Sequence, residues 1–169
     1  MNKVINIFLI LLLFFLGGCN SSNYKPEPEY SDKLSTIRGN KVREGIFKWK
    51  LYEVVYIDDI LITSGFRHSP DKDIQVSPIE HTFTINALFN NDSSDTCPCE
   101  TWFKIKAKLE PNTAYKINGD PIGQSTKVWI EELDTGKRLT EVFNVAARPK
   151  GSGTFDVDVI DATVQTLSY

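Results

Sequence analysis

Apolar and polar residues alternate along most of the chain after Leu34, as in β-strands that bury one face. In segment 81–89 every second residue, from His81 to Phe89, lies on one face, and that face is otherwise apolar. Segment 103–109 repeats the pattern, with lysines at the intervening positions. Segment 47–56 has apolar residues in both phases, which predicts a β-bulge or a strand buried on both faces.

Turn signals separate these runs. Asp58-Asp59 and Asn118–Pro121 predict tight turns, and segment 133–137 predicts a hairpin between two β-rich runs. Polar loops are expected over 64–73 and 90–100, and little helical periodicity is present. The chain therefore predicts an all-β sandwich or barrel of about eight short strands.

The first nineteen residues follow a different pattern. Lys3 precedes an almost wholly apolar run, Val4 to Leu16, and small residues then lead to Cys19. A basic start, a short apolar core and a small-residue site are typical of a secretory signal peptide. The apolar core is shorter than the ~20 residues that a membrane-spanning helix needs. An uncleaved anchor helix is the alternative interpretation.

The ending Leu16-Gly17-Gly18-Cys19 resembles the lipobox of bacterial lipoproteins. The resemblance implies cleavage between Gly18 and Cys19 and acylation of the Cys19 sulfur by fatty acids such as palmitate. Asn20, rather than Asp, follows the cysteine, which favours the outer membrane, facing the periplasm, in a host with two membranes. We therefore divide the chain into a signal peptide (1–18), a lipidated cysteine with a flexible tether (19–33), a β-sandwich domain (34–148) and a joint with a C-terminal strand or tail (149–169).

Length and charge limit the classes of function. Removing residues 1–18 from the 169 leaves 151, which fits one domain, and the loss of Lys3 changes the formal net charge from −3 to −4. A mildly acidic chain without a basic run argues against nucleic acid as a partner. No further apolar segment has the length of a membrane span.

Cys97-Pro98-Cys99 is the sharpest local motif. An oxidising envelope compartment permits a disulfide between Cys97 and Cys99, and such a short ring contributes only roughly 1.5 kcal/mol before strain. Free thiols, a soft-metal site with His81 or His68, and a redox switch remain open alternatives. Neither histidine lies at a typical ligand spacing from the pair, so no metal or other cofactor is expected.

The other candidates have a plain structural interpretation beside a functional one. His81 is expected to be half-buried and bonded to backbone rather than a catalytic base, and His68 is expected to be solvated. Four aspartates could bind Ca²⁺, namely Asp58, Asp59, Asp71 and Asp73. The spacing of an EF-hand is missing, so a turn and a charged loop are the plain interpretation. Glu131, Glu132 and Asp134 are expected on the solvent side of a hairpin. Three tryptophans could cover a core or line a sugar-binding surface, namely Trp49, Trp102 and Trp129.

Several segments of the body resemble a group of bacterial lipoproteins with a small β-sandwich, distantly similar to PEGA-type domains. They are Ser35–Gly39, Tyr56–Asp59, Val76–His81, Leu109–Tyr115 and Val128–Lys137. This chain has Asp59 and Ile79 where members typically have glycine. The resemblance covers about residues 35–140. It implies an Ig-like or PEGA-like sandwich and an envelope location, but no reaction.

We therefore predict a lipid-anchored envelope protein that acts as a non-enzymatic binding or scaffolding module. Its partner would be another envelope protein or a cell-wall glycan. No catalytic motif is present, such as Gly-x-Ser-x-Gly, His-Glu-x-x-His or a Walker sequence. The alternative is an envelope enzyme, or a metal or redox accessory protein that uses Cys97 and Cys99.

Overall fold

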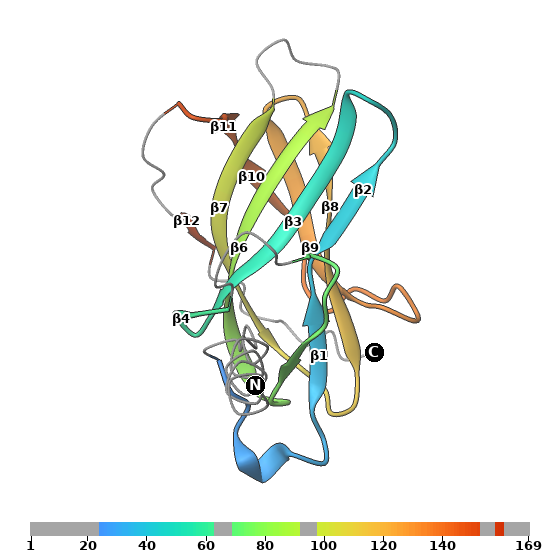
Figure 1. Ribbon diagram of the computed structural model, residues 1–169, viewed down its shortest axis with the longest axis vertical. Helices are drawn as coiled ribbons and strands as arrows, with labels where there is room; N and C mark the ends of the chain where they lie inside the picture. Colours follow the sequence, from blue (N-terminus) through green and yellow to red (C-terminus); the bar gives the residue numbers. More distant parts are fainter. Residues whose placement is uncertain (1–23, 63–68, 92–97, 153–157, 161–169) are drawn as a thin grey trace, which may run out of the picture.

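The computed structural model describes residues 24–62, 69–91, 98–152 and 158–160. Two sheets pack face to face, and the described residues contain no α-helix, only a 3₁₀ turn, η1 (Pro28–Tyr30). Figure 1 shows β3, β6 and β7 crossing the front of the molecule, with β9 and β10 behind them. The all-β prediction is confirmed, although the strands are more numerous and several are shorter than expected.

The first sheet, sheet A, has the strand order β10-β9-β8-β1-β5. Neighbours are antiparallel except β1 and β8, which run parallel. The strand bounds are β1 (Ser35–Arg38), β5 (Ile74–Val76), β8 (Ala114–Ile122), β9 (Ser125–Glu132) and β10 (Phe143–Ala146). The hairpin expected around 133–137 is present, since Leu139 N–H donates to the Ile130 carbonyl and β10 then pairs with β9.

The second sheet, sheet B, has the order β11-β7-β6-β3-β2, with β12 parallel to β7 and β4 paired with β3. Its bounds are β2 (Asn40–Arg43), β3 (Lys48–Ile57), β4 (Ile60–Leu61), β6 (Glu80–Asn91), β7 (Cys99–Lys108), β11 (Arg148–Pro149) and β12 (Asp158–Ile160). The predicted bulge lies in β3 between Val54 and Tyr56. The Asp58-Asp59 turn is also confirmed, because both residues have positive φ and join β3 to β4.

The core lies between the sheets and is built from the inward positions of the alternating runs. Its largest fully buried side chains include Tyr52, Phe83, Phe103 and Tyr115. The Tyr52 hydroxyl lies 2.6 Å from Thr126 Oγ1, which gives this buried polar group a partner in the opposite sheet. Burial raises the pKa of Tyr52 far above its ordinary value, so the phenol stays neutral.

The turn expected at Asn118–Pro121 is wrong. Strand β8 continues through these residues to Ile122, and the chain turns at Gly123, where φ is +60°. Gly119 serves close packing instead: a Cβ there would lie 2.6 Å from the Tyr52 hydroxyl oxygen and 2.4 Å from the Lys127 carbonyl oxygen. Glycine in a strand often marks such a close approach rather than a turn.

The loop expected over 90–100 is also shorter than predicted. Strand β6 extends to Asn91 and β7 begins at Cys99, so Cys99 is a strand residue. Phe89 opposite Cys99 is fully buried. An apolar pair at the end of the hairpin therefore outweighs the polar composition around it.

Candidate binding surface

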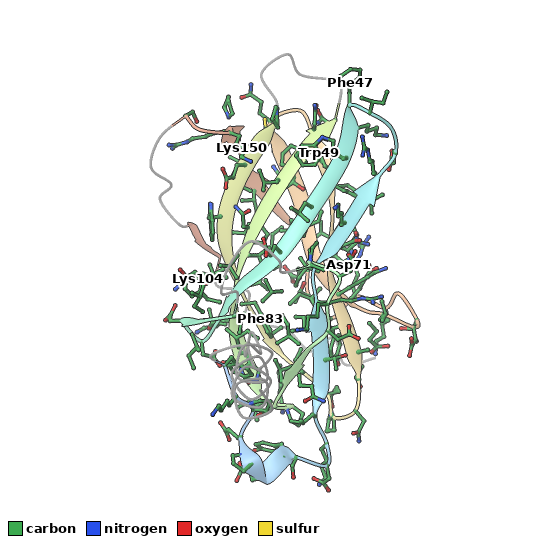
Figure 2. All side chains as sticks on the ribbon, viewed as in Figure 1. Phe47, Trp49, Asp71, Phe83, Lys104 and Lys150 are labelled. Carbon is green, nitrogen blue, oxygen red and sulfur yellow. The ribbon has the colours of Figure 1, made fainter. Side chains whose placement is uncertain are left out.

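The outer face of sheet B carries the most unusual combination of side chains. Its residues are placed by the register of β3, β6 and β7: Trp49 lies opposite Asn90, Leu51 opposite Leu88, and Trp102 opposite Asn86. Both tryptophans and both leucines are half-buried. We call the outward residues of these strands around and between the two tryptophans the Trp49–Trp102 strip. They are Trp49, Leu51 and Glu53 of β3, Asn86, Leu88 and Asn90 of β6, and Glu100 and Trp102 of β7. Figure 2 shows Trp49 near the upper end of this face.

A carboxylate is fixed in the middle of the Trp49–Trp102 strip. Glu100 Oε1 accepts hydrogen bonds from Asn86 Nδ2, at 2.9 Å, and from Trp102 Nε1, at 3.2 Å. Asn86 is only 5% exposed, so this arrangement is tightly packed. The two bonds hold Glu100 and the Trp102 ring in place. The second carboxylate oxygen of Glu100 accepts no hydrogen bond from the residues that the structure describes and can take another donor.

Glu53 lies beside this network, opposite Asn86 in the register. It is partly buried and makes no hydrogen bond or ion pair within the described part of the chain. Burial raises the pKa of the Glu53 carboxyl above its ordinary value. A partly buried acid without a donor is costly for the folded protein, which makes this position a candidate for contact with a ligand.

A cleft opens between the sheets next to Trp49. Its volume is about 120 Å³. Its lining residues are Val42, Glu44, Lys48, Trp49, Lys50, Asn90, Asn91, Asp120 and Pro121. Lys50 Nζ donates to the Gly119 carbonyl at 2.7 Å and lies 3.2 Å from Asp120 Oδ1. Its charge is therefore already paired across the cleft.

One polar atom in the cleft is unsatisfied. Asn91 Nδ2 donates to the Gly123 carbonyl at 3.1 Å, whereas Asn91 Oδ1 is buried and has no hydrogen-bond partner among the described residues. Exposed apolar side chains occur at the same end of the sandwich: Ile46 and Phe47 are 75% and 67% exposed. Figure 2 shows Phe47 at the tip of the β2–β3 hairpin. This end combines aromatic and apolar side chains with one buried acceptor that lacks a partner among the described residues.

The opposite end of the sandwich is closed by the segment before β1. Tyr24 is 9% exposed and packs its ring edge against His81, with centroids 6.0 Å apart. Burial raises the pKa of Tyr24, although hydrogen bonds with Ser77 oppose the shift. The Glu27 N–H also donates to Ser77 Oγ, at 2.8 Å. The last ten residues of the segment expected as a tether thus include direct contacts with the sandwich.

His81 is a structural residue in this closed end. It is 3% exposed, with Nδ1 2.6 Å from Asp58 Oδ2 and Nε2 2.9 Å from the Ser77 carbonyl oxygen. The bond to backbone agrees with the prediction, but the burial is deeper than expected because Tyr24 covers the ring. With both ring nitrogens engaged, His81 offers neither a metal-binding nor a proton-accepting atom to solvent.

Three of the four acidic residues considered for Ca²⁺ have separate partners. Asp58 binds His81 and the Thr82 N–H, Asp59 lies 2.8 Å from Lys104 Nζ, and Asp73 lies 3.9 Å from Arg38. In the described residues, no three His, Cys, Asp or Glu side chains gather as metal ligands. His68 lies outside the described residues. The carboxylates of Asp58, Asp59 and Asp73 therefore serve local turns and strand contacts.

Trp129 and Glu131 belong to the outer face of sheet A, and the expectation that Glu131 faces solvent is wrong. Glu131 is 8% exposed and accepts hydrogen bonds from Trp129 Nε1, Asn118 Nδ2 and Lys116 Nζ. Burial raises the pKa of Glu131, but these three donors outweigh it, so its net pKa is lowered. Arg138 covers the Trp129 ring at 4.9 Å. This part of sheet A is a closed polar network.

The cysteine motif is only partly described. Cys99 is fully buried with Phe89 and Ala147, instead of lying in a polar loop. Cys97 lies outside the described residues, as does the proposed lipidation site, Cys19. The disulfide between Cys97 and Cys99 therefore stays a prediction.

No protein-family model matches the chain, and no curated protein or solved structure matches it either. Of the helices in the described ranges, none is long and apolar enough to cross a bilayer.

Proposed function

We propose that the protein is a lipid-anchored, non-enzymatic binding module of the bacterial envelope. The main observation in support is the contrast between the two ends of the sandwich. One end is closed by Tyr24, Ser77 and His81. The other end has a cleft, exposed apolar side chains and Asn91 Oδ1, which has no partner within the described part of the chain. A surface with apolar groups and a few unpaired acceptors is suited to bind a partner.

The anchor would set the orientation of this surface. Cys19 precedes Tyr24 by five residues, and five residues of extended chain span at most about 18 Å. Because Tyr24 contacts the closed end, a lipid on Cys19 would hold that end close to the membrane. Phe47 and Trp49 would then face away from the bilayer, toward an envelope protein or a cell-wall glycan (Figures 1 and 2).

The proposal also covers the location of the protein in the cell and the family that its sandwich resembles. It comprises a cleaved signal peptide ending at Gly18, acylation of Cys19, and residence in the outer membrane facing the periplasm of a Gram-negative host. The two-sheet arrangement is compatible with an Ig-like or PEGA-like sandwich. The signature Leu16–Cys19 supports the anchor.

The accessory-protein alternative receives less support from the described residues. A redox or metal role would require an accessible sulfur, whereas Cys99 is fully buried beside Phe89. The ring nitrogens of His81 already have partners. At the open end, by contrast, Asn91 Oδ1 has no hydrogen-bond partner among the described residues.

Two measurements test the proposal. Mass spectrometry of the full chain from its native membrane should find lipid on Cys19, and Cys19→Ser should release the protein from membranes. A photo-crosslinking residue placed at Phe47, at the open end, should form adducts with an envelope component in cells. The matched control is the same residue at Glu29, an exposed position of η1 at the closed end. Absence of lipid, or equal adducts at both positions, would overturn the proposal.

A further inference from the structure

The Trp49–Trp102 strip has the dimensions of an extended chain. Along β6, the partners of Trp49 and Trp102 are Asn90 and Asn86, four residues apart, and the tryptophans lie on the strands on either side. With about 3.4 Å per residue and about 4.8 Å between strands, their Cα atoms are roughly 17 Å apart. This is longer than one sugar ring and suits a ligand of several units.

The width of the strip argues against a protein partner on this face alone. The strip is about 14 Å long along the strands, and three strands make it about 10 Å wide, hence an area of roughly 140 Å². A stable protein interface, including one with a second copy of this chain, needs about 800 Å² on each partner. A narrow, single-chain ligand matches the strip better than a globular surface does.

The chemistry of the strip requires a ligand that donates hydrogen bonds and has apolar faces. Glu53 has no donor among the described residues, and the second oxygen of Glu100 is available. Leu51 and Leu88 pair between the two tryptophans and are half-buried. Pyranose rings meet both demands, because their C–H faces pack on indole rings and their hydroxyl groups donate to carboxylates.

Charge narrows the choice of glycan. The acceptors in the middle of the strip are two carboxyl groups, so an acidic sugar would place like charges together. Basic side chains lie at its margins, with Arg43 opposite Trp49 and Arg148 opposite Glu100. A neutral or N-acetylated chain avoids the repulsion and offers hydroxyl and amide donors.

We infer that the Trp49–Trp102 strip binds a neutral or N-acetylated glycan chain, with sugar rings stacked on Trp49 and Trp102 and hydroxyl or amide groups donating to Glu53 and Glu100. This inference names the ligand class of the binding module and rests on that proposed function. It extends the binding surface from the cleft, which Trp49 lines, along the outer face of sheet B.

The test uses the full chain in detergent micelles and two probes: a soluble oligosaccharide of N-acetylglucosamine, and isolated peptidoglycan sacculi. Calorimetric titration should show saturable binding of the oligosaccharide, and the sacculi should co-sediment the protein. Trp102→Leu keeps much of the apolar volume but removes the aromatic face, so it should weaken binding about tenfold, as should Trp49→Leu. The matched control is Trp129→Phe, on the outer face of sheet A, which should leave binding unchanged.

Several results would overturn the inference. These are absence of binding to both probes, equal binding by the Trp102→Leu variant, or equal binding of an oligogalacturonate of similar length. Dimerisation of the full chain that Trp102→Leu abolishes would assign the face to a second copy instead. If Trp102→Leu unfolds, Trp102→Phe should fold and bind with only a small loss, since it keeps an aromatic face. Loss of binding in a folded Trp102→Phe variant at the level of a non-aromatic change would also contradict stacking.

Failure of this inference can be told apart from failure of the proposed function. Adducts at Phe47 but not at Glu29, together with no glycan binding, would leave the binding module intact and remove its glycan. Glycan binding that depends on Trp49 and Trp102, without lipid on Cys19, would keep the inference and remove the anchored role.

Discussion

The outer faces of the two sheets each pair a tryptophan with a glutamate, yet the two faces differ in how far their polar groups are satisfied. On sheet A, Glu131 accepts bonds from three donors, and Arg138 covers Trp129. On sheet B, Glu100 binds Trp102 and Asn86, but the neighbouring Glu53 has no described partner. The pKa shifts agree with this difference, because the pKa of Glu131 is lowered and the pKa of Glu53 is raised.

This difference separates a face that stabilises the fold from one suited to bind something else. Buried polar groups normally find partners within the protein, so a satisfied network indicates structure and an unsatisfied one calls for an explanation. Mutations on the outer face of sheet A should therefore affect stability, whereas mutations on the outer face of sheet B should mainly affect binding.

The largest contrast is expected between two tryptophans. Trp129→Ala should lower the free energy of unfolding by about 3–5 kcal/mol, because it removes a buried indole and leaves the Glu131 carboxylate short of a donor. Trp102→Ala, at a half-buried position, should cost only about 1–2 kcal/mol. Urea unfolding of both variants, followed by circular dichroism, measures the difference. Equal losses would show that the two faces have the same structural role.

Next in size is Glu131→Gln, which should cost about 2–3 kcal/mol at pH 7 by leaving Lys116 without its ion-pair partner. The folded-state pKa of Glu131 lies below its ordinary value of 4.5, so the carboxylate stabilises the fold above that pH. This contribution is lost as the pH falls through the folded-state pKa. Wild type and variant should therefore converge in acid, and a gap that is constant with pH would contradict the network.

A third variant tests whether the tolerance of sheet B to mutation is confined to its outer face. Cys99 faces the buried side with Phe89, so Cys99→Ser should cost about 2 kcal/mol by burying a hydroxyl group and losing any bond to Cys97. If the disulfide exists, Cys97→Ser should cost about 1 kcal/mol less than Cys99→Ser. It removes the short ring but does not bury a hydroxyl group at position 99. Alkylation of the denatured, unreduced chain reports the bond directly. Two alkylated thiols at Cys97 and Cys99 would remove the disulfide prediction.

The smallest effect, and the one of opposite sign, is expected for Glu53→Gln. Because the folded-state pKa of Glu53 is raised above 4.5, folding favours its protonated form, and stability falls as the pH rises through that folded-state pKa. The neutral amide should therefore stabilise the protein at pH 7 by less than about 1 kcal/mol. The gain should vanish below pH about 4, where wild type is protonated too. Destabilisation at pH 7 would mean that the carboxylate already has a donor.

Much of the fold follows from local pattern. The alternation in 81–89 and 103–109 determined which residues of β6 and β7 face the core, and Asp58-Asp59 and 133–137 marked two turns correctly. The turn at Asn118–Pro121 failed, because Gly119 is required by the nearby Tyr52 ring rather than by a turn. A local pattern cannot reveal such a contact, since Tyr52 and Gly119 lie 67 positions apart in the chain.

The sequence by itself determined the all-β character and the two faces of each strand, because both follow from which side chains avoid water. It also raised the anchor at Cys19 and the three tryptophans as candidates. Only the tertiary structure decided which tryptophan is structural. Arg138 covers the ring of Trp129 and the Trp129 Nε1–H donates to Glu131, while Trp49 and Trp102 remain half-exposed. The physical reason is that hydrogen bonding and burial depend on strand neighbours, and parallel or crossed pairings such as β1 with β8 bring together residues that lie far apart in the sequence.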